Sequence, residues 1–413
     1  MFRRKASSKN TATGSLDTPG PSWWRTKVVI DVNPGFSSWI EIEPVSPVFI
    51  GSDEKIERFE TIVEGNMVYI LDFQKLLGRD DFVELFVAKM QDILDPSVKD
   101  RAMKEIFQKL NLKLSEVSLD SFPAQWRNNK PDNLQMKRFV RSAGRYYVPG
   151  SSIKGAIRTA LIRSDQSLVR RFEDLLKTIV EDSMKESKQG MKREKKRNIK
   201  IERVIFRSPN QSPFRLLEIS DSDFIDKKFV KFKLITVRNL LNVKTKIPMM
   251  LELWLDNQDE SNKVRVLLQS RVDRLSQMKN WITDPGKLLE TLGDKGKFIE
   301  AVKSATEKII QLEIERIKKA LNSNEFKLIL SFYEKLREEN KKMRDGFILR
   351  LGAQTGFFSK TFFTRFLNRN ELEFLKSPHK VYNLFPVSIS IAEPSYESPV
   401  PKPLGWVRVR FVS

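Results

Sequence analysis

The sequence predicts an α+β fold in which strand-forming segments near both ends of the chain enclose two long helical regions. Apolar residues alternate along Trp39–Val45 and again along Trp406–Val412, as they do in half-buried strands. In residues 73–115 and 285–343, the apolar residues instead recur at the spacing of a helix. Because helices and strands follow one another irregularly, the pattern argues against a doubly wound parallel sheet.

In the first half of the chain, strands are predicted at Thr26–Asp31 and Trp39–Val45. A hairpin follows over Ile62–Ile70, where Gly65–Asn66 can supply the positive φ angles of a two-residue turn. The helical segment 73–115 reads as an insertion. A second strand region, Met136–Val148, then leads into a helix.

In the second half, the long helical region shows apolar residues at 3–4 spacing, which is typical of core packing. A short helix is expected over Lys360–Leu367, and four prolines between Pro394 and Pro403 predict an extended connector. The closing strand should direct Arg408 and Arg410 to the face opposite its apolar residues. The remaining predicted strands are Phe214–Ile219, Phe229–Val237, Pro248–Leu255, Val264–Leu268 and Gly346–Leu351.

The amino-acid composition excludes several kinds of functional site and favours one kind of partner. The 413 residues include 74 Lys and Arg against 53 Asp and Glu, a formal net charge of +21, with one histidine and no cysteine. The lack of cysteine excludes thiol catalysis, disulfides, zinc fingers and iron–sulfur clusters, and the single His379 excludes a paired-histidine zinc site. The charge favours a polyanionic partner, most commonly nucleic acid. A membrane surface, an acidic protein or plain solubility would also account for it.

The length suggests two or three units of about 150 residues. No apolar run approaches the roughly 20 residues that span a bilayer, and no apolar stretch follows the basic residues 1–9, so we expect a cytoplasmic protein without a secretory signal. Residues 1–25 are expected to form a flexible arm. Residues 185–200, half of them Lys or Arg, are expected to form a solvated loop, with a binding element as the alternative.

The most informative segment is residues 146–161, YYVPGSSIKGAIRTAL. Ser151 or Ser152 is predicted to cap a helix, and Lys154 and Arg158 would share one face, one turn apart. A helix start beside two cations suits a backbone phosphate. Gly155 should be compensated by close approach of another backbone. An ordinary capped helix with surface cations is the alternative. The apolar face would comprise Ile153, Ala156, Ile157, Ala160 and Leu161.

Two further loops are candidates. Gly352 and Gly356 lie between a predicted strand and helix, where glycines let backbone amides approach a ligand, and Arg350, Lys360 and Arg365 add charge. A tight turn without a ligand is the alternative. An earlier loop, residues 47–54, ends in the acidic pair Asp53-Glu54, which is usually a polar turn.

Taken in order, these segments resemble the RAMP superfamily of CRISPR-Cas systems, and within it the fifth Csm subunit of the type III-A effector complex. The resemblance rests on SPVFIGS at 46–52, VYILD at 68–72, PGSSIKGAIR at 149–158 and the loop from Leu351-Gly352 to Lys360-Thr361. The third of these is specific to the superfamily, and the early and late segments point to the subunit. The resemblance extends over residues 38–412.

This resemblance implies two ferredoxin-like (RRM-like) domains with helical insertions. They would cover residues 26–220, with the insertion 73–115, and residues 221–413, with the insertion 285–343. It further implies a non-catalytic subunit that needs no cofactor or metal, caps the 3′ end of the CRISPR RNA and assists maturation of that end. Its partners would be the CRISPR RNA and the backbone and other subunits of the complex, with target RNA left open.

Carried over by position, the resemblance implies that Lys154 and Arg158 contact guide phosphates and that Gly352–Gly356 forms the glycine-rich loop of the family. Such a subunit must accept any spacer sequence, so it should grip phosphates and stack on bases. The alternative is a metal-dependent RAMP ribonuclease that cleaves target RNA through Asp53. The full set of RNA-binding candidates is Ser151, Ser152, Lys154, Gly155, Arg158, Arg350, Gly352, Gly356 and Lys360.

Overall fold

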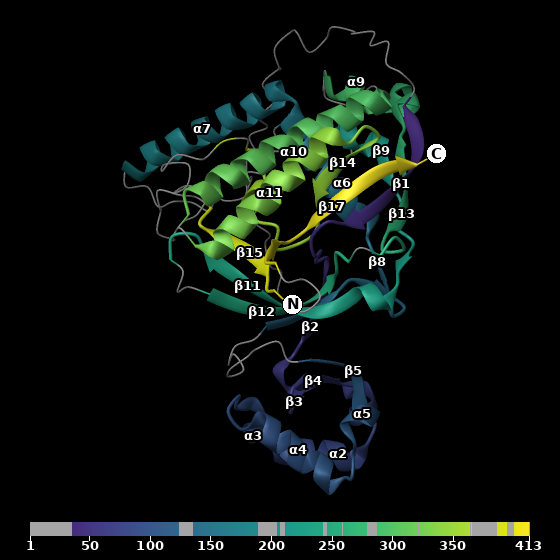
Figure 1. Cartoon of the computed structure of the whole chain (residues 1–413), viewed down its shortest axis with the longest axis vertical. Coiled ribbons are helices and arrows are strands. Elements are labelled where there is room, and N and C mark those ends of the chain that lie inside the picture. Colours follow the sequence, from purple (N-terminus) through teal and green to yellow (C-terminus); the bar gives the residue numbers. More distant parts are fainter. Residues whose placement is uncertain are drawn as a thin grey trace, which may run out of the picture.

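The computed structural model shows a main body built on two large sheets and a smaller lobe beside it (Figure 1). The predicted arm, the strand at Thr26–Asp31, His379 and residues 189–200 of the basic run lie outside the described residues. The structure describes residues 35–123, 135–188, 205–206, 211–242, 246–257, 259–278, 287–320, 323–363, 365, 386–394 and 400–412.

The first sheet has five antiparallel strands in the order β14–β17–β1–β13–β9. Two helices, α6 (Gly150–Ser164) and α10 (Lys295–Lys318), pack their apolar residues against one face of it and form the largest core. In the chain, α6 lies between β1 and β9, and α10 lies between β13 and β17. The strands are β1 (Phe36–Pro44), β9 (Leu217–Ile219), β13 (Val264–Ser270), β14 (Gly346–Arg350) and β17 (Trp406–Val412).

The second sheet has six strands in the order β16–β15–β11–β12–β6–β2. The α11 helix (Asn324–Lys342) and the second half of α10 form a core with β15 and with Trp406 of the first sheet. Both sheets combine strands from either side of residue 220, and the predicted domain boundary there stays a prediction. The strands are β2 (Gly51–Ile56), β6 (Gln135–Phe139), β11 (Val230–Asn239), β12 (Lys246–Trp254), β15 (Ser388–Ala392) and β16 (Lys402–Pro403).

The lobe is the predicted hairpin with the predicted helical insertion, and both are confirmed. Gly65 adopts φ 55° at the hairpin turn. The helices bury their own core, while the stacked rings of Phe122 and Phe232, 4.6 Å apart, join the lobe to the second sheet. Its elements are β3 (Thr61–Glu64), β4 (Met67–Leu71), β5 (Ser118–Pro123), α1 (Phe73–Leu77), α2 (Asp80–Ala88), α3 (Met90–Leu94), α4 (Lys99–Lys109) and α5 (Leu114–Val117).

Short elements complete the body. A three-stranded sheet comprises β7 (Arg141–Ser142), β8 (Arg145–Tyr147) and β10 (Phe224–Ile225), and the further helices are α7 (Gln166–Lys188), α9 (Lys287–Gly293) and α12 (Phe357–Lys360). The long helical region predicted over 285–343 is confirmed by α9, α10 and α11.

Two predicted elements need correction. The strand expected at Phe214–Ile219 begins as a 3₁₀ helix, Pro213–Leu216, because Pro213 favours a helical first turn, and only β9 remains as strand. The helix expected at Lys360–Leu367 is instead α12, which ends at Lys360. The side chain of Arg163 donates hydrogen bonds to the carbonyls of Phe358 and Thr361, so the chain need not continue the helix to satisfy them.

The segment that precedes α6 is held by a buried carboxylate on β12. Glu252 accepts hydrogen bonds from the backbone N–H of Phe139, at 2.8 Å, and from the hydroxyl of Tyr146, at 2.6 Å. Burial raises the pKa of Glu252, with the two hydrogen bonds opposing that shift. One acidic side chain thus joins three segments, β12, β6 and β8.

This raised pKa predicts a pH dependence of stability. A carboxyl whose pKa rises on folding contributes most below its unfolded value, about 4.3, and loses that contribution as pH rises through its folded pKa. The unfolding free energy of the wild type, minus that of Glu252→Gln, should therefore fall between pH 5 and pH 8. Urea unfolding at both pH values measures this difference, and a difference that grows with pH would contradict it.

Candidate nucleic-acid interface

The first turn of α6 is closed by a residue distant in sequence. Pro149 occupies the N-cap position, and the N–H of Gly150 donates to Oδ1 of Asp221 at 2.7 Å. Ser151 and Ser152 lie inside the helix, one and two positions after its first residue, so the predicted serine cap is wrong. A carboxylate already occupies this end, so Lys154 and Arg158 further along α6 are the positive charges that remain of the predicted motif.

The predicted apolar face of α6 is confirmed. Ile153, Ile157 and Leu161 are fully buried against the five-stranded sheet, and Ala160 is nearly so. Ala156 is partly buried and packs against the same core. This packing fixes the rotation of the helix and therefore which of its residues face outward.

Lys154 and Arg158 lie together on one side of α6, as predicted. Both are half-buried. The Arg158 guanidinium lies 5.3 Å from the ring centroid of Phe214 and 6.0 Å from that of Phe206, a cation–π geometry. Burial lowers the pKa of Lys154; Glu218 opposes this shift and Arg158 adds to it. Two partly desolvated cations one turn apart attract an anion more strongly than fully solvated ones.

Gly155 lies next to these cations and differs from its prediction. It is exposed, and among the described residues no other segment comes within 4 Å of a Cβ atom added there. The outer surface of α6 therefore carries only small residues, Ser151 and Gly155, along one line, with Lys154 and Arg158 to one side of it. A ligand backbone could approach the helix closely along this line.

The glycine loop after β14 packs against the early loop at residues 47–54. The N–H of Ala353 donates to the carbonyl of Phe49 at 2.7 Å, and that of Leu351 donates to the carbonyl of Gly405 at 2.7 Å. Gly352 has φ 93°, and a Cβ there would overlap the Phe49 carbonyl. The early and late segments of the resemblance therefore form one structural junction.

The charged residues around this loop divide into two kinds. Arg350 is 8% exposed; it pairs with Glu313 at 2.9 Å and donates to the carbonyl of Leu404. It is therefore an internal structural residue, and its selection as a phosphate contact is corrected. Lys360, by contrast, is exposed. The neighbouring Gly356 is also exposed, and no described residue lies within 4 Å of a Cβ added there.

Helix α6 links the two candidate regions. Lys154 and Arg158 lie toward its start and middle. The buried Arg163 near its end holds α12 through the carbonyls of Phe358 and Thr361. Lys308 of α10, which sequence reasoning missed, lies nearby, with its ammonium 3.5 Å from the carbonyl oxygen of Arg163. Burial lowers the pKa of Lys308, and Arg163 adds to this shift. Only the packing of α10 against α6 reveals this cation.

Asp53, the residue of the ribonuclease alternative, lies within β2 rather than in a loop. The pairing of β2 with β6 changes register between Gly51 and Lys55. Across the part of the chain that the structure describes, no group of three or more His, Cys, Asp or Glu residues could hold a metal ion. Within the same residues, no helix is long and apolar enough to cross a bilayer.

A protein-family model matches most of this chain. The family model of the RAMP superfamily matches residues 41–380, which include α6, its cations and the glycine loop. The chain belongs to the RAMP superfamily. The membership predicted from the four sequence segments is thereby confirmed.

Named relatives of this RAMP protein come from two comparisons. It is 26% identical over 198 residues to the "CRISPR system Cms protein Csm5" of Methanocaldococcus jannaschii, a match that covers 47% of this chain and 45% of that relative. This agrees with the subunit that the sequence resembles.

Two solved structures share the fold. One is a chain of a Csm–crRNA–target RNA ternary complex of a type III-A CRISPR-Cas system, with a TM-score of 0.59, 19% identity and coverage of 91% of this chain and 100% of that one. The other is T. onnurineus Csm5, with a TM-score of 0.56, 19% identity and coverage of 89% and 99%. The mixed helix-and-sheet RAMP fold expected from the sequence is confirmed at this level.

Proposed function

We propose that this RAMP protein is the Csm5-type subunit of a type III-A CRISPR complex, where it binds the CRISPR RNA at its 3′ end and assists maturation of that end without cleaving RNA. The observation that carries the proposal is the surface of α6, where Lys154 and Arg158 lie together on one side of the exposed Gly155. Its partners would be the CRISPR RNA, the other Csm subunits and target RNA, in the cytoplasm.

The chemistry of this surface suits the RNA backbone rather than particular bases. Lysine and arginine attract phosphates whatever the sequence, and an exposed glycine lets the sugar–phosphate chain approach the helix. Gly356 and Lys360 extend the proposed contact toward the glycine loop. A subunit that accepts every guide needs this kind of grip.

The strand order supports one part of the predicted domain architecture. The antiparallel order β17–β1–β13–β9, with α6 and α10 on one face, has the β–α–β–β–α–β arrangement of a ferredoxin-like domain. We assign this sheet as one of the two predicted ferredoxin-like domains. It would then combine segments from both sides of residue 220, so the proposed boundary would mark a position in the chain rather than a division in space.

A salt series tests the proposed grip. When a variant binds one phosphate fewer, the slope of log K against log salt should become shallower by about 0.7 for single-stranded RNA. We expect this change for Lys154→Ala and for Arg158→Ala, measured by filter binding. The matched control is Lys109→Ala, an exposed lysine at the end of α4 in the lobe. Unchanged slopes in both α6 variants would remove these residues from the interface.

Gly155 provides a variant that separates stability from binding. Replacing an exposed mid-helix glycine by leucine should raise the unfolding free energy by about 0.5–1 kcal/mol, because leucine has the higher helix propensity. The same side chain would block close approach of RNA, so we expect Gly155→Leu to weaken RNA binding about tenfold. The control is Gln108→Leu, on the exposed face of α4. Full RNA affinity in Gly155→Leu would contradict the proposed path.

A further inference from the structure

The five-stranded sheet has a second face, opposite α6 and α10. On β1, Ile40 and Ile42 are fully buried toward the helices. Successive side chains of a strand point to opposite faces, so Trp39, Glu41 and Glu43 project from the second face. Trp39 is 49% exposed there. Tryptophan is enriched at protein interfaces, because its indole combines a large apolar surface with one N–H donor.

Two cations beside Trp39 on this face share one carboxylate. Glu41 pairs with Lys263 at 2.9 Å and with Arg265 at 3.0 Å. The hydrogen bond from Lys263, together with Arg265, holds the pKa of Glu41 below its usual value. The shared carboxylate reduces the attraction that these two cations offer an RNA phosphate.

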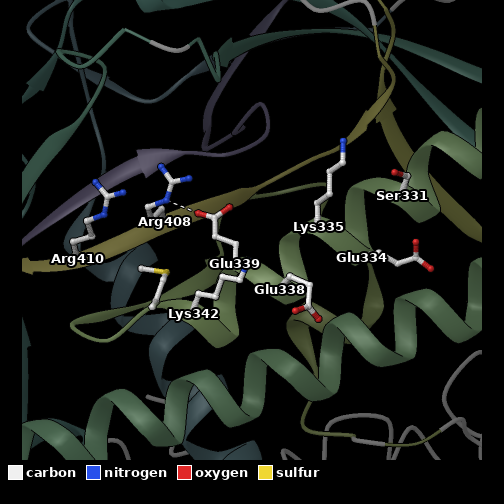
Figure 2. A pocket seen from close by; sticks show the side chains of 9 residues that line it. Ser331, Glu334, Lys335, Glu338, Glu339, Lys342, Arg408 and Arg410 are labelled. Carbon is white, nitrogen blue, oxygen red and sulfur yellow. Dashed lines mark hydrogen bonds and ion pairs between the residues drawn. The ribbon is translucent and has the colours of Figure 1, made fainter.

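In the groove between α11 and β17, basic side chains are likewise paired with carboxylates. This hollow of about 780 Å³ contains Arg408 and Arg410 on one wall and the α11 side chains on the other (Figure 2). Arg408 bridges Glu43, at 2.7 Å, and Glu339. The groove is lined by Ser331, Glu334, Lys335, Glu338, Glu339, Lys342, Met343, Arg408 and Arg410, so its charges nearly balance.

A second hollow, of about 380 Å³, lies beside Trp39 and has a different charge. Asp221 and Asp223 contribute two exposed carboxylates to its wall. Each accepts one backbone N–H, from Gly150 and Arg265 respectively, whereas a carboxylate can accept about four hydrogen bonds. The lining of this hollow carries the carboxylates of Asp221 and Asp223 against the single guanidinium of Arg265, so its net charge is negative. The remaining lining residues are Ser220 and Val412.

We propose that this hollow docks an arginine side chain of a neighbouring protein subunit. A guanidinium can stack on the exposed indole of Trp39 while donating paired hydrogen bonds to Asp221 or Asp223. On a chain of net charge +21, this acidic hollow repels RNA and selects a basic protein segment. The proposal rests on the proposed function, because the neighbour is a subunit of the same complex.

The test uses the full chain, the companion Csm subunits and CRISPR RNA. Trp39→Ala and Asp223→Asn are each expected to weaken binding of the chain to the preassembled remainder of the complex about tenfold. Asp223→Lys should weaken it further, because it reverses the charge. Asn at position 223 keeps an acceptor for the Arg265 N–H, so the sheet is preserved. Native mass spectrometry measures incorporation, and filter binding shows that the isolated variants keep their RNA affinity.

Matched controls are Ile247→Ala, an apolar residue 57% exposed on β12, and Glu84→Gln on the lobe, both expected to leave incorporation unchanged. Normal incorporation of the Trp39 and Asp223 variants would overturn the docking site alone. Equal loss of RNA affinity in the isolated variants would also overturn it, since RNA would then be the occupant. If the wild-type chain fails to join the complex, the proposed function and the docking site both fall.

Discussion

Replacing Glu313 by glutamine is expected to lower the unfolding free energy by about 3–5 kcal/mol, because it leaves two arginines buried without a counter-charge. Glu313 is 1% exposed on α10 and pairs with Arg316 of the same helix and with Arg350 of β14. Arg316 also donates to the carbonyls of Pro386 and Ser388. Two buried arginines at the junction of the two large sheets therefore share one carboxylate as their counter-charge.

Urea unfolding of wild type and variant at one pH measures this loss. The control is Glu300→Gln, which removes a carboxylate from the same helix that is 69% exposed and paired with Lys303. Such a surface pair contributes about 0–1 kcal/mol. If both variants lose equally little stability, the buried network does not have the stabilising role that its geometry indicates.

Gly352→Ala is expected to destabilise the protein by about 2–5 kcal/mol, since a left-handed backbone and a steric overlap combine at one residue. Gly352 has φ 93°, and the new methyl group would overlap the carbonyl oxygen of Phe49, which accepts the N–H of Ala353. The early loop would have to move away from the glycine loop. Thermal unfolding followed by circular dichroism measures the loss.

Gly356→Ala separates the two causes. Gly356 also has a positive φ, 79°, but none of the described residues would contact a Cβ placed there. With ψ 178°, Gly356 lies in a region of backbone conformation that is almost exclusive to glycine, so this control should show backbone strain alone, about 1–3 kcal/mol. A loss in Gly352→Ala no larger than that in Gly356→Ala would show that the junction with Phe49 yields easily.

The sequence predicted those features of the site that depend on local spacing. The apolar repeat along α6 placed Lys154 and Arg158 on one side of the helix, because that arrangement follows from 3.6 residues per turn. The cap of α6 could not be predicted in this way, since Asp221 lies 71 residues after Gly150. A serine at a helix start is a good local cap, but tertiary packing supplied a different acceptor.

The same reason explains the correction at Arg350. A basic residue before a glycine loop resembles a ligand contact, and only the fold brings Glu313, 37 residues earlier, within 2.9 Å of it. From the sequence, Trp39 is recognisable only as part of a strand, because alternation does not reveal whether the outer face of a sheet is covered. At the fold level, alternation predicted β1 and β17 but not that they would be neighbours.

The pairing of β1 with β17, from opposite ends of the chain, affects how the protein folds during its synthesis. The Trp406 N–H donates to the Ser46 hydroxyl across 360 residues, and β17 lies between β14 and β1 in the interior of its sheet. At about 5–20 residues per second, a ribosome needs roughly 20–70 s to make the intervening chain. During that time the edge of β1 has no partner and can pair with other nascent chains. Slow translation or chaperone shortage should therefore reduce the yield of native protein more than the stability of the finished molecule suggests.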